Sequence, residues 1–366
     1  MKRFLCILTL LSSLAAPAQI RWIHPFEEGA QVHGQGWSEL NQTYFRLPDK
    51  AKDVVSKKIW GLSRNAAGLS LVFRSNAPVI YVRYQVKDSL NTYHMPSTGR
   101  SGVDLFARDN DGGLRWCGPK FRPIFGDTIL YQYNDITYYP QGADSYEYHL
   151  YLPLYNTLEW LEIGIPQKSF LTFVPVGDEK PIVVYGTSIV QGACASRPGM
   201  AWTSMVECDL RHPVINMGFA GCGKMEPEVF ELLAEIDAGI YVIDCMPNMV
   251  SQANLIQERL LKGLEILRAK HDCPILIVEH SGYVNEVTNE KRGKSYQKAN
   301  RMLQEAYKEA CAQGIKGLYY LTREEFGLQM NGMVEAVHPS DLGMRQLADG
   351  IEQKLRKIIR KNKVYR

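Results

Sequence analysis

The sequence lacks a large excess of charge of either sign. Its 42 Lys and Arg residues nearly balance its 39 Asp and Glu residues, which gives a formal net charge of +3. Such a balance excludes general attraction to nucleic acid or to anionic membranes, because that attraction needs a clear basic excess. Hydrophobic residues make up 45% of the 366 residues and charged residues 22%. This composition is typical of a globular protein and excludes disorder and coiled coil.

Long hydrophobic runs are also missing after the first 18 residues. Residues 4–14 are apolar, but this run is too short to cross a bilayer. It follows the basic start Met1-Lys2-Arg3 and precedes Ala16-Pro17-Ala18, which fits the A-x-A pattern of a cleavage site. We therefore predict a signal peptide cut after Ala18, a mature chain that starts near Gln19, and an exported protein, periplasmic or secreted, with no membrane span.

Cysteine patterns typical of metal sites are absent too. The eight cysteines include no C-x-x-C pair, and no spacing of cysteine and histidine resembles a zinc site. Removal of the signal peptide would leave an odd number of cysteines, so at least one would stay free or pair between chains. In an oxidising compartment the candidates for a disulfide are Cys194 with Cys222, or Cys194 with Cys245.

The first half of the chain has the two-residue period of β-strands. Apolar and polar residues alternate between Ile80 and Val86, and ranges 146–152 and 158–165 have the same character. The turn signal Asp-Asn-Asp-Gly-Gly at 109–113 separates such runs. Many short strands with few helical stretches predict a β-sandwich, jelly-roll-like, over residues 19–177.

A different pattern starts at residue 178. Short apolar runs alternate with helical patterns in which apolar residues recur every three or four positions. The apolar runs are residues 182–185, 214–215, 240–243 and 275–278, and the clearest helical patterns are residues 256–267 and 344–358. Strands that alternate with helices form βαβ units. We therefore predict an α/β domain over residues 178–366, with a parallel sheet covered by helices on both faces.

Small residues and single polar groups follow these apolar runs. In open α/β sheets a site forms beyond the carboxyl ends of the strands. Gly186-Thr187-Ser188 follows the first run, and Asn216-Met217-Gly218-Phe219-Ala220-Gly221 follows the second. Asp244-Cys245-Met246-Pro247-Asn248 follows the third, and Glu335-Ala336-Val337-His338 comes near the end of the chain. Ser188 alone would be interpreted as a helix N-cap, so its function depends on the other three segments.

The four segments, in this order, resemble the conserved blocks of the SGNH (GDSL) hydrolase superfamily. The nucleophile block of that superfamily is Gly-Asp-Ser with variants, so the resemblance implies Ser188 as the nucleophile. The second and third blocks imply Gly221 and Asn248 as oxyanion-hole residues. The last block is Asp-x-x-His in the superfamily and Glu-x-x-His here, which implies His338 as the base and Glu335 as the acid that orients it.

Further segments are similar to one exported bacterial branch of this superfamily, whose members join an N-terminal β-sandwich to a C-terminal SGNH domain. These segments are residues 194–200, residues 225–228, and Gly102-Val103-Asp104-Leu105-Phe106, which resembles the GxDLY-type signature of the sandwich. The resemblance covers nearly the whole mature chain and implies a three-layer, flavodoxin-like SGNH domain. Arg100 and Asp104, both in the segment from Ser97 to Ala107, are hypothesised to border the catalytic pocket.

The chemistry of ester hydrolysis explains these residue types. A serine hydroxyl becomes a good nucleophile when a base takes its proton, and the neutral imidazole of His338 can do so near neutral pH. Glu335 can bind the other ring nitrogen and fix the tautomer. The backbone N–H groups of Ser188 and Gly221 and the amide of Asn248 can donate to the developing oxyanion. This chemistry requires neither a metal ion nor an organic cofactor.

Export, the added sandwich and the resemblance to carbohydrate esterases predict that the partner is an acyl ester of a carbohydrate. The predicted reaction removes O-acetyl or other short acyl groups from a small molecule or a polysaccharide. Two alternatives stay open. One is a lipase or thioesterase that uses the same residues on lipid substrates, and the other is a non-catalytic glycan-binding protein with a decayed SGNH half. The change from Asp to Glu335 is the feature that favours a decayed site.

Polar residues outside the four segments have weaker claims to function. Asp341 is interpreted as a negatively charged residue that stabilises the start of the last helix. Asp244 is interpreted as a residue that positions the third segment. Glu279 and His280 follow the fourth apolar run, so they also belong to the edge where a site is expected. They could contact a substrate or be ordinary loop residues.

Overall fold

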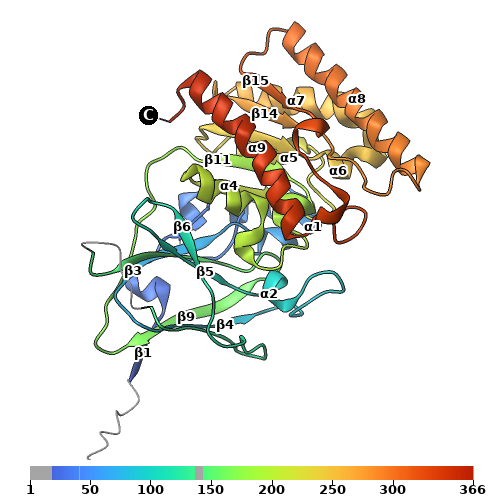
Figure 1. The fold of residues 1–366 in the computed structure, drawn as a ribbon. Helices are drawn as coiled ribbons and strands as arrows, with labels where there is room; N and C mark the ends of the chain where they lie inside the picture. Colours follow the sequence, from blue (N-terminus) through green and yellow to red (C-terminus); the bar gives the residue numbers. More distant parts are fainter. Residues whose placement is uncertain (1–18, 41, 137–142, 366) are drawn as a thin grey trace, which may run out of the picture.

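The computed structural model describes residues 19–40, 42–136 and 143–365. The predicted signal peptide and its cleavage site at Ala18 lie outside the described residues. Among the described residues, no helix is both long enough and apolar enough to cross a membrane. Two antiparallel sheets come first along the chain, and a parallel sheet with its helices follows (Figure 1).

The N-terminal domain consists of two antiparallel sheets that share a hydrophobic core. One sheet has the strand order β1-β9-β4-β7, and the other has the order β10-β3-β8-β5-β6, with β2 paired to β3. The strands are β1 Ile20–Ile23, β2 Val32–His33, β3 Ser70–Ser75, β4 Ile80–Val86, β5 Asp104–Arg108, β6 Leu114–Cys117, β7 Ile129–Tyr133, β8 Tyr146–Tyr151, β9 Leu158–Pro166 and β10 Leu171–Phe173. Two short helices, α1 Lys57–Ser63 and α2 Ser97–Arg100, interrupt the strands.

The two-residue period of the sequence produces this core. Ile80, Val82 and Tyr84 of β4 are buried, and they belong to the same cluster as Leu71 and Phe73 of the other sheet. The residues between them point away from the cluster, because successive side chains of a strand lie on opposite faces. The prediction of an N-terminal domain built from short strands is therefore confirmed, whereas its jelly-roll-like connectivity stays a prediction.

The C-terminal domain has a five-stranded parallel sheet in the order β12-β11-β13-β14-β15. Its strands are β11 Ile182–Gly186, β12 Val214–Gly218, β13 Ile240–Asp244, β14 Ile275–Val278 and β15 Leu318–Leu321. Its helices are α3 Ser188–Gln191, α4 Trp202–Leu210, α5 Pro227–Leu233, α6 Met246–Met249, α7 Ile256–Arg268, α8 Glu290–Ala312 and α9 Asp341–Asn362. The four apolar runs of the sequence form β11 to β14, while β15 was not predicted. The α/β prediction with a parallel sheet is confirmed.

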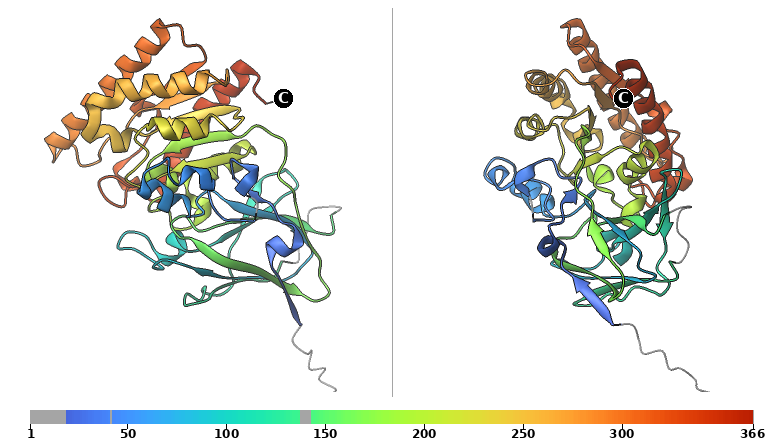
Figure 2. Two further views of the ribbon diagram at one scale, coloured as in Figure 1. Left: turned by 180° about the vertical axis from the view of Figure 1, so that it is seen from behind. Right: turned by 90° about the vertical axis from the view of Figure 1, so that its left-hand side faces the viewer.

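Helices cover both faces of the parallel sheet. Val183 and Tyr185 of β11 are buried in a cluster with α5, α7 and α8. Ile182 and Val184, which alternate with them, are buried in a cluster with α4 and α9. Figure 1 shows α4 and α9 in front of the sheet, and a half-turn of the molecule brings α7 and α8 to the front (Figure 2). A strand buried on both faces explains why the sequence of β11 is apolar throughout.

The N-terminal domain also contributes to the core of the parallel sheet. Trp37, Leu47 and Ile59 are buried in the cluster that covers one face of this sheet. Arg46 is fully buried, and its guanidinium donates to the backbone carbonyls of Gly218 at 2.7 Å and Asn216 at 3.2 Å. A buried guanidinium is tolerated only when its donors are paired. Arg46 therefore holds the N-terminal domain against β12.

Candidate active site

The ends of three neighbouring strands bring the predicted site segments together. β11 lies between β12 and β13, and Gly186 pairs in register with Gly218 on one side and Asp244 on the other. Parallel strands end at the same edge, so the segments that follow β11, β12 and β13 meet there. A Cβ atom on Gly218 would lie 2.2 Å from the backbone nitrogen of Gln191. The small residues of these segments therefore permit close packing of the loops.

Ser188 starts α3 directly after β11. The residue before it, Thr187, is the N-cap, and its hydroxyl accepts from the backbone N–H of Ile189 at 3.3 Å. The hydroxyl of Ser188 is thus not used to cap the helix. Its Oγ lies 2.9 Å from Nε2 of His338. The backbone carbonyl of Ser188 accepts from the hydroxyl of Tyr155 at 3.0 Å, so the N-terminal domain contacts the segment that carries Ser188.

His338 and Glu335 occupy the loop before α9. The Nδ1 atom of His338 contacts the carboxylate of Glu335. The same carboxylate accepts from the backbone N–H groups of His338 at 2.8 Å and Val337 at 3.2 Å. These backbone bonds hold the longer Glu side chain in a turn that directs it at the imidazole. The His338 side chain is 20% exposed and that of Glu335 is 39% exposed, so the pair faces an open surface.

Gly221 and Asn248 lie next to each other at the same edge. The side-chain amide of Asn248 donates to the backbone carbonyl of Cys222. Gly221 has a positive φ of 64°, which favours glycine, and it is exposed. A Cβ atom on Gly221 would lie 2.6 Å from Nζ of Lys58, so this lysine of α1 reaches over the turn. Lys58 could not be predicted from the sequence, because no local pattern links α1 to this turn.

Asp104, which was hypothesised to border the catalytic pocket, is a buried residue of β5. It is 3% exposed and accepts from Trp116 Nε1 at 2.6 Å, Arg197 Nη1 at 2.5 Å and the backbone N–H of Gly199 at 3.0 Å. Burial raises the pKa of Asp104, and the nearby Arg197 guanidinium opposes this shift. The sandwich signature therefore holds the segment after Cys194 against the N-terminal domain.

The start of α9 holds the same segment from the other side. Asp341 accepts from the backbone N–H of Ser196 at 2.8 Å and from its hydroxyl at 2.5 Å. Asp341 is the first residue of α9, as expected, but it also has this second role. Segment 194–200 is thus fixed between the N-terminal domain and the helix that follows His338.

Removing Arg197 tests this contact between domains. Arg197→Met is expected to lower the free energy of unfolding by about 3 kcal/mol, because it leaves the buried carboxylate of Asp104 without its charged partner. Urea unfolding of the full chain measures this change. Arg115→Met is the matched control, since Arg115 is 60% exposed in its ion pairs with Asp109 and Asp111. Its loss should cost less than about 1 kcal/mol. An equal decrease in the free energy of unfolding for the two variants would contradict the role of Arg197.

Glu279 and His280 are both buried. Glu279 accepts from the Tyr320 hydroxyl at 2.8 Å and from the backbone N–H of Arg323 at 2.9 Å, which joins β14 to the segment after β15. Burial lowers the pKa of His280 to about 3, so its ring stays neutral. Asp244 is also buried, which raises its pKa to about 7. Of the two interpretations of Glu279 and His280, the structure favours a structural one.

The described cysteines are all free. They are Cys117, Cys194, Cys208, Cys222, Cys245, Cys273 and Cys311. Neither of the two candidate disulfides of Cys194 is therefore formed in this structure.

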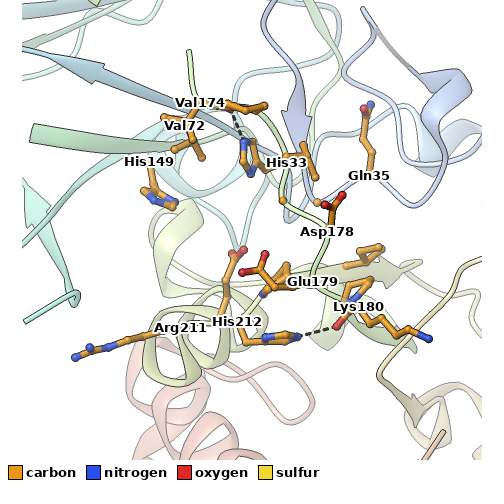
Figure 3. Close-up of a pocket in the computed structure, with 18 of the residues that line it drawn as sticks. His33, Gln35, Val72, His149, Val174, Asp178, Glu179, Lys180, Arg211 and His212 are labelled. Carbon is orange, nitrogen blue, oxygen red and sulfur yellow. Dashed lines mark hydrogen bonds between the residues drawn. The ribbon is translucent and has the colours of Figure 1, made fainter. Parts of the chain in front are cut away.

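A separate cavity of about 560 Å³ lies between the domains (Figure 3). His33 and His149 line it from the N-terminal domain, and Lys180, Arg211 and His212 line it from the C-terminal domain. These last three residues precede β11 and β12, so the cavity lies at the amino ends of the parallel strands. It is therefore at the opposite edge of the sheet from Ser188.

Serine, histidine and carboxylate side chains thus contact one another at the carboxyl edge of the parallel sheet of an α/β domain. The chain belongs to the GDSL-like lipase/acylhydrolase family, whose model matches residues 179–356. Residues 20–171 match the model of the N-terminus of SGNH-hydrolase-type esterases. A structure from Bacteroides ovatus, described as a GDSL-like lipase, is 30% identical with a TM-score of 0.85. The match covers 93% of this chain and 98% of that one. The resemblance seen in the sequence is confirmed.

Two more distant structures share the fold. The salicylyl acyltransferase SsfX3 from a tetracycline biosynthetic pathway is 16% identical, with a TM-score of 0.72 over 93% of this chain and 97% of that one. An active-site mutant of a family two carbohydrate esterase from Clostridium thermocellum is 10% identical, with a TM-score of 0.52 over 79% and 90% of the two chains. No curated protein sequence matches this chain.

Proposed function

We propose that this protein is an exported serine esterase that removes short acyl groups, in the simplest case acetyl, from carbohydrates. The observation that carries the proposal is the contact of Ser188 Oγ with His338 Nε2 at 2.9 Å, together with the contact of His338 Nδ1 with Glu335. Membership of an acylhydrolase family supports the reaction class. The exported location rests on the predicted signal peptide.

His338 acts first as a base and then as an acid in this proposal. Nε2 takes the proton of the Ser188 hydroxyl while Oγ attacks the ester carbonyl carbon. The imidazolium then gives that proton to the leaving alcohol, and an acyl-serine remains. A water molecule attacks the acyl-serine in the second half, with His338 again taking and returning a proton. Glu335 keeps the proton on Nδ1 and stabilises the positive charge of the ring.

Three N–H groups are proposed to stabilise the oxyanion. They are the backbone N–H groups of Ser188 and Gly221 and the side-chain amide of Asn248. The amide group of Asn248 has two N–H bonds. One reaches the carbonyl of Cys222, which fixes the orientation of the side chain, and the other is proposed to bind the carbonyl oxygen of a substrate.

The open surface around the site supports a carbohydrate ester. His338 and Glu335 are partly exposed, so a sugar ring can approach them without entering a tunnel. Tyr93 is 96% exposed and packs on His94, whose ring centroid is 5.7 Å from that of His338. An exposed tyrosine offers an apolar face and a hydroxyl, which suits a sugar ring. The carbohydrate esterase from Clostridium thermocellum shares the fold.

Release of p-nitrophenol from p-nitrophenyl acetate, butyrate and octanoate tests the proposal. The mature protein should turn over the acetate ester best, and turnover should require Ser188. Rates that rise with acyl length would favour the lipase alternative. Glycan binding without turnover of any ester or acetylated glycan would favour the decayed-enzyme alternative.

The change from Asp to Glu335 leads to a separate prediction. Glu335→Gln is expected to lower kcat by about tenfold to a hundredfold, because the amide holds no negative charge to stabilise the imidazolium. The effect is smaller than for a buried acid, since Glu335 is 39% exposed and water screens its charge. Glu335→Asp is the matched control, and it tests whether the shorter acid keeps the contact. An unchanged rate in Glu335→Gln would show that another group orients His338.

A further inference from the structure

Three side chains that can bind a metal ion lie together beside Ser188. One ligand atom from each of His94, Cys194 and His338 lies within 4.8 Å of the other two. His94 lies between β4 and α2 of the N-terminal domain, Cys194 follows α3, and His338 precedes α9. The sequence showed no zinc spacing, because these residues are about 100 positions apart or more.

One nitrogen of His338 is already held in the manner of a zinc ligand. Nδ1 contacts Glu335, so Nε2 is the nitrogen that a cation would bind. Histidines that ligate zinc commonly donate their other ring N–H to a carboxylate, which fixes the ring and raises its basicity. Glu335 therefore orients His338 so that Nε2 can bind a cation as well as accept from a serine hydroxyl.

His94 has a ring nitrogen that makes no hydrogen bond to the described residues. Within the part of the chain that the structure describes, Nδ1 of His94 is buried and has no hydrogen-bond partner. Buried polar atoms are almost always paired. A cation held between the rings of His94 and His338, whose centroids are 5.7 Å apart, would bind one ring nitrogen of each.

We propose that His94, Cys194 and His338 bind a zinc ion, and that the bound ion inhibits the esterase by occupying Nε2 of His338. The inhibition rests on the proposed function, whereas the binding does not. Two imidazoles and a thiolate suit zinc and exclude magnesium and calcium, which prefer oxygen ligands. Bonds to zinc are about 2.0–2.1 Å long from nitrogen and about 2.3 Å long from sulfur. The ligand atoms now lie within 4.8 Å of one another, and they would have to move about 1 Å closer together to bind the ion.

Binding has a simple proton balance. The thiol of Cys194 releases its proton to solvent when the zinc–sulfur bond forms, and each imidazole contributes a lone pair. Because the zinc–sulfur bond forms only when the Cys194 thiol has lost its proton, the ion competes with that proton. While the ion is bound, Nε2 has no lone pair to accept the proton of Ser188. Removal of the ion restores the base.

Cobalt binding to the Ser188→Ala protein tests the site without relying on turnover. Co²⁺ replaces Zn²⁺ in such sites, and a cobalt–thiolate bond gives a charge-transfer band in the near ultraviolet. We expect this band on titration with Co²⁺, its loss when Zn²⁺ is added, and no effect of Mg²⁺. Absence of the band would overturn the binding proposal.

Matched variants assign the ligands. In the Ser188→Ala background, Cys194→Ser should abolish the charge-transfer band, and His94→Gln should weaken Co²⁺ binding at least ~10-fold. Cys311→Ser is the control, because Cys311 is an exposed cysteine outside the cluster, and its band should be unchanged. A band that survives in Cys194→Ser, or disappears in Cys311→Ser, would show that the ion binds elsewhere.

Hydrolysis of p-nitrophenyl acetate tests the inhibition. Zn²⁺ should inhibit the unmodified protein reversibly, and a chelator should restore the rate. Cys194→Ser and His94→Gln, each compared with its own metal-free rate, should need at least ~10-fold more Zn²⁺ for the same inhibition. Zinc that binds without slowing turnover would overturn the inhibition. A protein with no turnover at all would count against the proposed function, while the cobalt spectrum would still decide the binding.

Discussion

Replacement of Ser188 by alanine is expected to lower kcat on p-nitrophenyl acetate by at least ~10³-fold. The alanine has no oxygen to attack the ester, and His338 at 2.9 Å loses the hydroxyl whose proton it takes. Only binding and the oxyanion donors would remain, and these account for the residual rate of serine hydrolases without their nucleophile. Initial rates of the purified variant and the unmodified protein give the ratio.

The fold should survive this change. Thr187, not Ser188, caps α3, so the hydroxyl of Ser188 has no structural hydrogen bond to lose at the helix start. Urea unfolding should therefore give the same midpoint for both proteins. Ser295→Ala on α8 serves as the control, because its hydroxyl donates to the backbone carbonyl of Arg292 in its own helix. Turnover in Ser188→Ala equal to that in Ser295→Ala would disprove the nucleophile assignment.

Replacement of Asn248 by alanine is expected to lower kcat by ~10²–10³-fold with little change in KM. The amide donor acts on charge that develops in the transition state, and the substrate carbonyl in the ground state carries little of that charge. Loss of such a donor therefore slows the chemical step more than it weakens binding. Full Michaelis curves on p-nitrophenyl acetate separate the two parameters.

Asn248→Asp provides the matched control for this prediction. Aspartate has nearly the same shape as asparagine but offers oxygen acceptors and a negative charge in place of an amide donor. It should slow turnover at least as much as Asn248→Ala, because it repels the oxyanion. A change confined to KM in both variants would assign Asn248 to substrate binding and not to the oxyanion.

The contact between the domains gives the sandwich a role at the candidate site. Tyr155 donates to the carbonyl of Ser188, and Arg46 donates to the carbonyl of Gly218. Asp104 and Arg197 hold the segment that follows Cys194. The N-terminal domain therefore supports the loops around Ser188. This role is separate from any binding of a ligand by the domain itself. A boundary at residue 178 stays a prediction, since Ile59 packs in the core of the parallel sheet.

Local patterns in the sequence were sufficient for the strands and for the segments that follow them. Strands β11 to β14 are buried on both faces, so each reads as a short apolar run bounded by small or polar residues. β15 was missed because its first three residues, Leu318, Tyr319 and Tyr320, are only half-buried. The two tyrosines interrupt the apolar run by which the other strands were recognised. Arg46 was missed because a lone arginine has no pattern of its own.

The two-part architecture, the family and the candidates Ser188, Glu335 and His338 could be predicted from the sequence, because each depends on the order of residues within a short segment. Which other side chains meet them depends on the tertiary structure. Asp104 turned out to be a buried support, and His94 and Cys194 came to lie beside His338. Contacts between residues about 100 positions apart or more depend on how the sheets and loops pack, and no local pattern records that packing.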